Sequence, residues 1–321
     1  MKTPKPVVVV SQCLGFDACR YNGETIRDKF IEKLAAHVSF QKVCPEMEVG
    51  LGVPRKPVRL VRVGQSVKLL QPDTGQDVTS RMRRFSTSYT ASLDDVDGFL
   101  LKGRSPSCGI FDAKVYAKAE RSPAVERRPG LFAEAVLERF PHAAIEDEGR
   151  LSNFRIREHF LIKLFLSARF RAAKKAGTSG ALVRFQTEQK LLLMAYNQKE
   201  MRLLGKIVGN QDRRSIAEVW KLYETHLQQA LSRPARYASH INVLMHGLGY
   251  FSRQLSAKEK AHFLDLLEQY RTARVPLSAP VSVVRSWIER FDSDYLATQV
   301  FFEPYPPALI EMTDSGKGRG A

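Results

Sequence analysis

The sequence predicts an α/β domain, built on a mostly parallel sheet flanked by helices, followed by an all-α domain. In the first half, short β-branched runs alternate with segments of helical period, which is typical of a parallel sheet with helical crossovers. After Gly149 the alternation stops and only the helical period remains. A chain of 321 residues is also long for one hydrophobic core. We therefore expect an N-terminal domain over residues 1–150, a basic helix and linker over 151–180, a helical domain over 181–310 and a disordered tail over 311–321.

The N-terminal domain shows strand and helix signals in turn. The apolar runs predict strands at Val7–Val10, Phe40–Val43, Val58–Val63, Phe99–Leu101 and His142–Glu146. Helical periodicity predicts helices at Thr25–Ala36, Val78–Leu93 and Leu131–Arg139.

The second half opens with a basic amphipathic helix over Ser152–Lys175. From Leu182 to Arg274 the sequence keeps a helical period, interrupted mainly by glycine and proline. A last helix is expected over Val281–Val300.

The charge of the chain is strongly positive and unevenly distributed. The formal net charge is +16, of which residues 1–150 carry +5 and residues 151–321 carry +11. This asymmetry favours a polyanionic partner, with nucleic acid ahead of an anionic membrane. The alternative is a soluble protein that happens to be basic. For the helix over Ser152–Lys175, the alternative is a domain-packing helix with a solvated basic face. The candidate RNA-binding side chains are Arg155, Arg157, Arg169, Arg171, Lys174 and Lys175.

The chain has no apolar run of 18 or more residues, and the apolar run near its N-terminus is too short for a signal-peptide core. We therefore expect a cytoplasmic protein. Its four cysteines are then expected to be reduced, and to be ligands or catalytic groups rather than disulfides.

Three cysteines share one context, because Cys13, Cys44 and Cys108 each follow a strand signal and lie in or beside a Gly/Pro loop. In a parallel sheet such ends meet at one edge, so we expect the three thiols to converge. Three thiolates can hold a 4Fe–4S cluster with one open iron, or Zn²⁺ with an open fourth position. The alternative is three buried, inert cysteines. Cys19 is interpreted as a partly buried loop residue.

Polar residues near these cysteines are candidates for catalysis. Glu46 lies two residues after Cys44, where a carboxylate can act as a general base, although it can instead cap a helix or pair with Arg55. Ser105 and Ser107 flank a proline just before the third cysteine and can pass a proton or bond their own backbone. The chain lacks a P-loop motif, a G-x-G-x-x-G after its first strand and an H-E-x-x-H, so no nucleotide cofactor is expected.

The motifs around these residues resemble the thiouracil desulfidase family. They are Ser11–Gly15, Arg20–Gly23, Cys44–Glu46, Gly75–Thr79 and Ser105–Gly109. The resemblance implies that Cys13, Cys44 and Cys108 hold a 4Fe–4S cluster whose open iron takes sulfur from a thiolated pyrimidine. It also implies that Glu46 is the catalytic acid/base and that a serine, for which we favour Ser105 over Ser107, is a proton donor.

The second half resembles the helical YbgA-like domain that is often fused to this family. The matching segments are Leu182–Phe185, Lys190–Ala195, Asn242–His246, Gly249–Phe251 and Pro304–Pro306. Gln186, Gln189 and Tyr196 stand where that domain tends to carry histidines.

Proteins with this fusion are similar to tRNA 4-thiouridine desulfidases. The sequence therefore predicts an enzyme that converts 4-thiouridine in tRNA to uridine and releases sulfide. One alternative is a desulfidase of free thiolated pyrimidines such as 2-thiouracil, and another is a non-catalytic, zinc-containing RNA-binding protein.

Overall fold

A computed structural model describes residues 4–311 of the chain. It divides into two compact units, one that runs up to Ala168 and resumes at Ala308, and a second over Arg169–Pro307. The tail expected over 311–321 lies outside the described residues from position 312 onward. No helix among residues 4–311 is long and apolar enough to cross a membrane.

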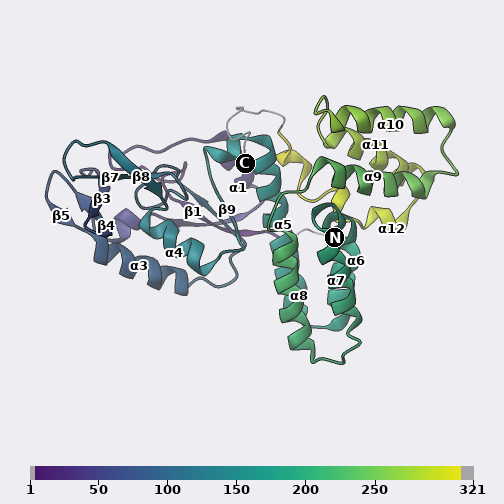
Figure 1. Cartoon of the computed structure of the whole chain (residues 1–321), viewed down its shortest axis with the longest axis horizontal. Helices are drawn as coiled ribbons and strands as arrows, with labels where there is room; N and C mark the ends of the chain where they lie inside the picture. The colour runs from purple at the N-terminus through teal and green to yellow at the C-terminus, as the bar shows by residue number, and fades with distance from the viewer. Residues whose placement is uncertain (1–3, 312–321) are drawn as a thin grey trace. The chain divides into compact units, whose positions relative to one another are not determined.

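Unit 1 is built on a four-stranded sheet in the order β2-β1-β6-β9. Figure 1 labels its strands β1 and β9. Its strands are β1 (Val7–Ser11), β2 (Ser39–Val43), β6 (Gly98–Leu101) and β9 (Ala144–Asp147). All three strand pairs in this sheet are parallel. The α/β class predicted for this half is confirmed.

The register of the sheet brings the carboxyl ends of its strands to one edge. Val10 of β1 lies opposite both Lys42 of β2 and Leu100 of β6, and Leu101 lies opposite Asp147 of β9. The loops that follow β1, β2 and β6 therefore start from the same edge, as expected for a parallel α/β sheet.

Helices pack on this framework through apolar residues. They are α1 (Lys29–Ala35), the short α2 (Pro45–Glu48), α3 (Thr79–Ala91) and α4 (Leu131–Arg139). Val9 and Phe99 of the sheet share a buried core with Phe132 and Val136 of α4. Helix α1 begins four residues later than expected, because the Asp28 side chain caps it by accepting hydrogen bonds from the backbone.

A second sheet, in the order β5-β4-β3-β7-β8, was predicted only in part. Its strands are β3 (Arg59–Val63), β4 (Ser66–Gln71), β5 (Gln76–Asp77), β7 (Ala113–Tyr116) and β8 (Ala124–Arg128). Only β3 carries a run long and apolar enough to be recognised in the sequence. The edge strands β5 and β8 have no buried residue, so they lack the alternation by which strands are found.

Unit 1 continues through a 3₁₀ turn (Arg150–Ser152) into the long helix α5 (Phe154–Ala176), and the boundary between the units falls within this helix. Asn153 caps α5, because its side-chain oxygen accepts hydrogen bonds from the backbone of Arg155 and Ile156. A final 3₁₀ turn covers Pro307–Leu309.

Unit 2 is helical, as predicted (Figure 1). Its elements are α6 (Ser179–Tyr196), α7 (Gln198–Gly209), α8 (Ile216–Ala230), α9 (Tyr237–Phe251), α10 (Ala257–Arg271), α11 (Ser278–Arg290), α12 (Asp294–Ala297) and a 3₁₀ turn at Val300–Phe302. The single last helix expected over Val281–Val300 is wrong. Helix α11 ends at Arg290 because Asp292 adopts a left-handed conformation, with φ of 49°, that an α-helix cannot continue through.

Aromatic side chains hold the first helices of unit 2 together. The Phe170 ring lies 5.4 Å from that of Phe185, 5.6 Å from that of Trp220 and 5.9 Å from that of Tyr223. Such ring pairs add to the stabilisation that burial alone provides. They join α5, α6 and α8 into one core.

Candidate active site

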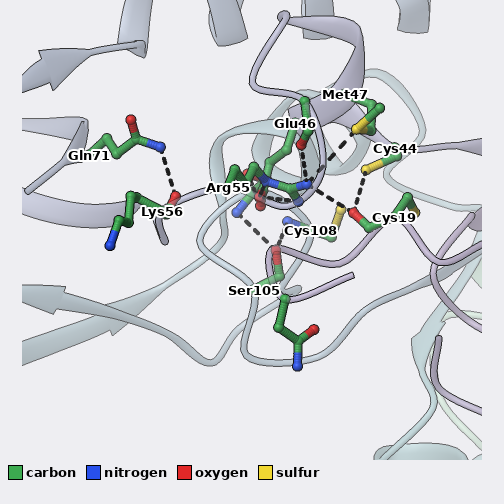
Figure 2. A network of polar contacts seen from close by, with 12 residues as sticks. Cys19, Cys44, Glu46, Met47, Arg55, Lys56, Gln71, Ser105 and Cys108 are labelled. Carbon is green, nitrogen blue, oxygen red and sulfur yellow. Dashed lines mark hydrogen bonds and ion pairs between the residues drawn. The ribbon is translucent and has the colours of Figure 1, made fainter. Parts of the chain in front are cut away.

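A cavity of about 190 Å³ lies where the loops after β1, β2 and β6 leave the first sheet. All four cysteines of the chain line it, together with Glu46, Arg55, Lys102 and Ser105. The predicted convergence of Cys13, Cys44 and Cys108 is therefore confirmed. Figure 2 shows that the labelled thiols and Glu46 gather around Arg55.

Each thiol is carried by a loop whose backbone is bonded to its neighbours. The carbonyl of Cys13 accepts a hydrogen bond from Ile26 N at 2.8 Å. Cys44 directly follows β2 and caps α2, whose first residue is Pro45. The strand ends are tied together, because Lys102 N donates to Ser11 Oγ at 2.9 Å.

Ser105 organises the loop that carries the third thiol. Its hydroxyl oxygen accepts hydrogen bonds from Ser107 N at 3.2 Å and Cys108 N at 3.1 Å. Gly130 packs directly against this loop, where a Cβ would lie 2.5 Å from the carbonyl of Ser107. Only glycine fits at that contact.

Cys19 is the site residue that the sequence did not indicate. The residue is 5% exposed and lines the same cavity as the other three cysteines. Its carbonyl accepts a hydrogen bond from Arg55 Nη1 at 2.9 Å and lies 3.9 Å from Cys44 Sγ. Its loop carries no periodic signal, so only the tertiary contact with Arg55 identifies it.

The environment of the thiols disfavours their ionised form. A hydrogen bond with Cys13 raises the pKa of Cys19 to about 11. A hydrogen bond with Cys19 and then burial raise the pKa of Cys44. Burial raises the pKa of Cys108 to about 12, against the opposing effect of the Ser11 and Ser105 hydroxyls. Metal binding requires thiolates, so a bound metal has to supply the charge that stabilises them.

Glu46 is held at both carboxylate oxygens. Oε2 accepts hydrogen bonds from Arg55 Nε at 2.9 Å and Nη2 at 2.6 Å. Oε1 accepts a hydrogen bond from the Ser107 hydroxyl at 3.0 Å. The Arg55 and Glu46 side chains are only 5% and 13% exposed, so this ion pair is largely buried. Glu46 therefore pairs with Arg55, which was the alternative to a catalytic role, and it also lines the cavity, as a catalytic role requires.

The two candidate serines occupy different places. Ser105 lines the cavity; its oxygen accepts two backbone hydrogen bonds, and its hydroxyl proton faces the cavity, where it also bonds the Cys108 thiol. Ser107 is fully buried and is not part of the cavity wall; its proton is used on Glu46. Ser105 can therefore reach a bound molecule directly, whereas Ser107 acts only through Glu46.

Lys102 forms a second charged contact at the cavity wall. Its ammonium pairs with Glu148 and donates to the carbonyl of Gly103 at 2.7 Å. Glu148 also accepts a hydrogen bond from Gly103 N at 2.9 Å. These bonds link the end of β6 to the residue after β9.

The donor set fits an iron–sulfur cluster better than a single ion. Among residues 4–311, no three or more His, Cys, Asp or Glu side chains are arranged to hold one metal ion. A zinc ion draws its sulfurs to within about 2.3 Å of one point, whereas a four-iron cluster is bulkier and binds thiolates at separate corners. Thiols that line one cavity without meeting at a single point can bind the separate corners of such a cluster.

The predicted RNA-binding residues are not one surface. Arg157 is only 4% exposed and donates to the carbonyls of Leu151 at 2.8 Å and Glu311 at 2.7 Å. Its prediction as a phosphate contact is therefore wrong, because a buried guanidinium bonded to carbonyls cannot reach an RNA backbone.

The other five differ in exposure. Arg169 is half-buried and donates to the Pro304 carbonyl at 2.6 Å, and burial lowers its pKa to about 10. Arg171 is also half-buried. Arg155, Lys174 and Lys175 are exposed, and Lys174 pairs with Glu224 at 2.7 Å. Only three of the six predicted RNA-binding residues are therefore exposed to solvent.

Two of the residues that depart from the YbgA-like pattern lie in the core of unit 2. Gln186 accepts a hydrogen bond from the Tyr223 hydroxyl at 2.6 Å. Gln189 is fully buried, and neither atom of its amide has a hydrogen-bond partner among the described residues. Tyr196 is half-buried at the end of α6.

The fold and the site define an α/β protein with a thiol-lined cavity at the edge of its parallel sheet, followed by a helical domain. Residues 8–148 match the family model described as 2-thiouracil desulfurase, and residues 190–306 match the model described as DUF1722. The chain belongs to the 2-thiouracil desulfurase family in its first half and carries a DUF1722 domain in its second.

Similar proteins match one half of the chain each. The uncharacterized protein YbgA of Escherichia coli (strain K12) is 30% identical over 158 residues, which are 49% of this chain and 93% of YbgA. The uncharacterized protein YbbK of Bacillus subtilis (strain 168) is 31% identical over 110 residues, 32% of this chain and 73% of YbbK. A solved structure named 4Fe-4S-dependent thiouracil desulfidase TudS is 26% identical, with a TM-score of 0.36, and the match covers 46% of this chain and 93% of that one.

Proposed function

We propose that this protein is a 4Fe–4S-dependent desulfidase that converts 4-thiouridine in tRNA to uridine. The observation that carries the proposal is the carboxylate of Glu46, oriented by Arg55 and Ser107 at the wall of a cavity lined by four thiols. The net reaction is a hydrolysis, in which the oxygen of water replaces sulfur on the ring carbon and both water protons leave with the sulfide. No external oxidant or reductant is required.

The cofactor proposal rests on the thiols and on the family. Cys13, Cys44 and Cys108 would hold the cluster, since each follows a strand end at the same edge of the sheet. When bound, a cluster with three protein ligands supplies an iron with an open coordination position that accepts sulfur.

Glu46 is the proposed base in this mechanism. Arg55 occupies Oε2 and keeps the carboxylate group from rotating, while Oε1 accepts one hydrogen bond among residues 4–311, from the Ser107 hydroxyl. The arrangement allows Oε1 to accept a proton from a water molecule that enters the cavity, as general-base catalysis requires. Ser107 is therefore a positioning residue.

Ser105 is the proposed proton donor. Two backbone N–H groups already bond its oxygen, which stabilises negative charge there and strengthens the hydroxyl as a donor. Because it lines the cavity, its proton can reach a ring nitrogen or the departing sulfur of a bound pyrimidine.

The charge of the chain supports tRNA as the substrate. A net charge of +16 is more than a free-base enzyme needs, and most of the excess lies in the half that follows the cavity domain. Phosphate contacts from Lys and Arg supply most of the affinity of a protein for RNA.

A free thiolated base is the second candidate substrate. The family model that matches residues 8–148 is described as 2-thiouracil desulfurase, and 2-thiouracil is a free base. The two candidate substrates differ in their need for the second domain, because only a tRNA substrate requires a domain that binds RNA.

The test is nucleoside analysis of thiolated tRNA after incubation with anaerobically reconstituted protein. Liquid-chromatography mass spectrometry should show loss of 4-thiouridine and an equal gain of uridine, with one sulfide released per conversion. A parallel reaction with free 2-thiouracil measures the second candidate. Turnover of the free base with intact 4-thiouridine in tRNA would reject the tRNA proposal, and turnover of neither would reject the desulfidase.

A further inference from the structure

The exposed face of α7 carries three cations and no acid. Its exposed residues are Gln198, Lys199, Arg202, Gly205, Lys206 and Gly209. The cations are spaced three and four residues apart, so they lie within one narrow stripe along the helix. We name Lys199, Arg202 and Lys206 the α7 stripe.

The acid of α7 lies on the opposite side. Glu200 is buried, and its Oε2 lies 2.7 Å from Nδ1 of His226 on α8. Met201 and Leu204 are buried on the same side of α7, which packs against α6 and α8. The two signs of charge are thus separated across the helix, with the negative charge turned inward.

The cations of the α7 stripe have no internal partner. No ion pair or hydrogen bond joins their side chains to any other residue in the described part of the chain, 4–311. Some other exposed cations of unit 2 are paired, among them Arg271 with Glu268 at 2.6 Å, Arg285 with Glu303 at 2.7 Å and Arg290 with Glu259 at 2.8 Å. The stripe therefore presents unneutralised charge.

The residues of the exposed face of α7 lower the stability of this helix. Lys199 lies in the first turn, where the helix dipole favours acids. Lys199 lies three residues before Arg202, which lies four residues before Lys206. Like charges are therefore neighbours on the helix surface. Gly205 weakens an exposed helix by about 1 kcal/mol relative to alanine. A Cβ there would meet only Gln186 Nε2 at 3.9 Å, so packing does not require glycine. Residues that lower local stability without a packing reason indicate function.

The length of the α7 stripe matches a nucleic-acid backbone. Seven residues of helix rise about 10 Å. One strand of B-form DNA carries one phosphate per about 3.4 Å of helix axis, so a stripe of this length can contact two or three successive phosphates of a nucleic-acid strand. The glycine between Arg202 and Lys206 leaves the surface low enough for a backbone to approach closely.

We propose that the α7 stripe binds the phosphate backbone of the substrate tRNA. The inference rests on the proposed function and locates its RNA contact on α7 rather than on α5. Charge complementarity and the absence of internal partners select a polyanion, and the lack of a large apolar side chain on the exposed face of α7 favours RNA over a membrane surface.

The experiment compares two triple variants of the full chain. The first, Lys199→Gln with Arg202→Gln and Lys206→Gln, removes the stripe. The control, Arg271→Gln with Arg285→Gln and Arg290→Gln, removes the same charge from ion-paired positions of the same unit. Glutamine keeps a high helix propensity, so both variants should retain their circular dichroism and melting behaviour.

Binding of thiolated tRNA is measured over a salt series. The stripe variant should bind at least about tenfold more weakly near 0.1 M salt, with the slope of log K against log salt reduced by about 2 to 3. The control should stay within about threefold of wild type, and both should turn over free 2-thiouracil normally. If the stripe variant binds tRNA with the wild-type slope while wild type desulfurates tRNA, the inference is wrong and the proposed function stands. If wild type binds no tRNA, both the inference and the tRNA proposal fail. Loss of binding to anionic phosphatidylglycerol vesicles with tRNA binding kept would assign the stripe to a membrane and overturn the inference.

Discussion

The hydroxyl of Ser107 donates a hydrogen bond to Oε1 of Glu46 at 3.0 Å, although the two residues are 61 positions apart in the chain. One belongs to the loop after β6 and the other to α2 after β2. The contact therefore joins two strand ends of the parallel sheet, and it positions the carboxylate that we propose as the base.

Ser107→Ala should lower kcat about tenfold and leave KM and iron content close to wild type. The variant removes the bond that orients Oε1 but leaves the thiols and Ser105 in place. Ser105→Ala is the comparison: it removes the proposed donor and the acceptor of two backbone N–H groups, so both kcat and iron content should fall. Equal effects of the two variants would contradict the separate roles.

Arg55→Met should cost about 3 kcal/mol or more of unfolding free energy, measured by urea denaturation. It leaves the carboxylate of Glu46 buried without its partner, and breaking such a pair is strongly destabilising. Adding Glu46→Gln should recover part of the loss, because the buried charge is removed too. If the double variant is as unstable as the sum of the two single variants, the pair contributes no coupling energy.

Cys108→Ala and Cys19→Ser distinguish the cluster ligands among the four thiols of the cavity. After anaerobic reconstitution, Cys108→Ala should lose most of its iron and its brown absorbance. Cys19→Ser should keep both, since the three strand-end thiols remain. Zinc in place of iron in the wild-type protein would instead support the non-catalytic alternative, and loss of iron from Cys19→Ser would make Cys19 a ligand.

Much of this site follows from the sequence because it depends on strand ends. A strand signal followed by a cysteine places Cys13 and Cys44 at the edge where parallel strands finish, and the register confirms it. The role of Cys19 could not be predicted in this way. Its position depends on the bond from Arg55 to its carbonyl, a contact across 36 residues that leaves no local pattern.

The errors in the fold have similar causes. The edge strands β5 and β8 have no buried residue, so their sequences look like loops. The break after α11 depends on the left-handed backbone of Asp292, which the apolar periodicity around it conceals. Arg157 looks like a surface cation, but carbonyl groups of its own unit hold it inside.

Gly130→Ala should abolish most activity by displacing the Ser105–Cys108 loop. A Cβ at this position would lie 2.5 Å from the carbonyl of Ser107, which is backbone and cannot turn away. We expect reduced iron content and a lower melting temperature. Gly180→Ala is the control, because nothing lies within 4 Å of its Cβ and the helix α6 gains propensity. Full activity of Gly130→Ala would mean that the loop tolerates movement.

Gly205→Ala should raise the stability of the protein by about 0.5–1 kcal/mol, measured by urea denaturation, because alanine restricts the unfolded chain and favours the helix. Its Cβ meets only the flexible end of Gln186 at an ordinary distance, so no strain opposes the gain. Gly205→Gln should also be at least as stable as wild type, yet it should bind thiolated tRNA more weakly, since its side chain projects between Arg202 and Lys206. Stability and RNA affinity would then change in opposite directions at one residue, which a purely structural role of this glycine does not predict. Wild-type affinity of Gly205→Gln, together with unchanged salt dependence, would mean that no RNA backbone approaches this part of α7.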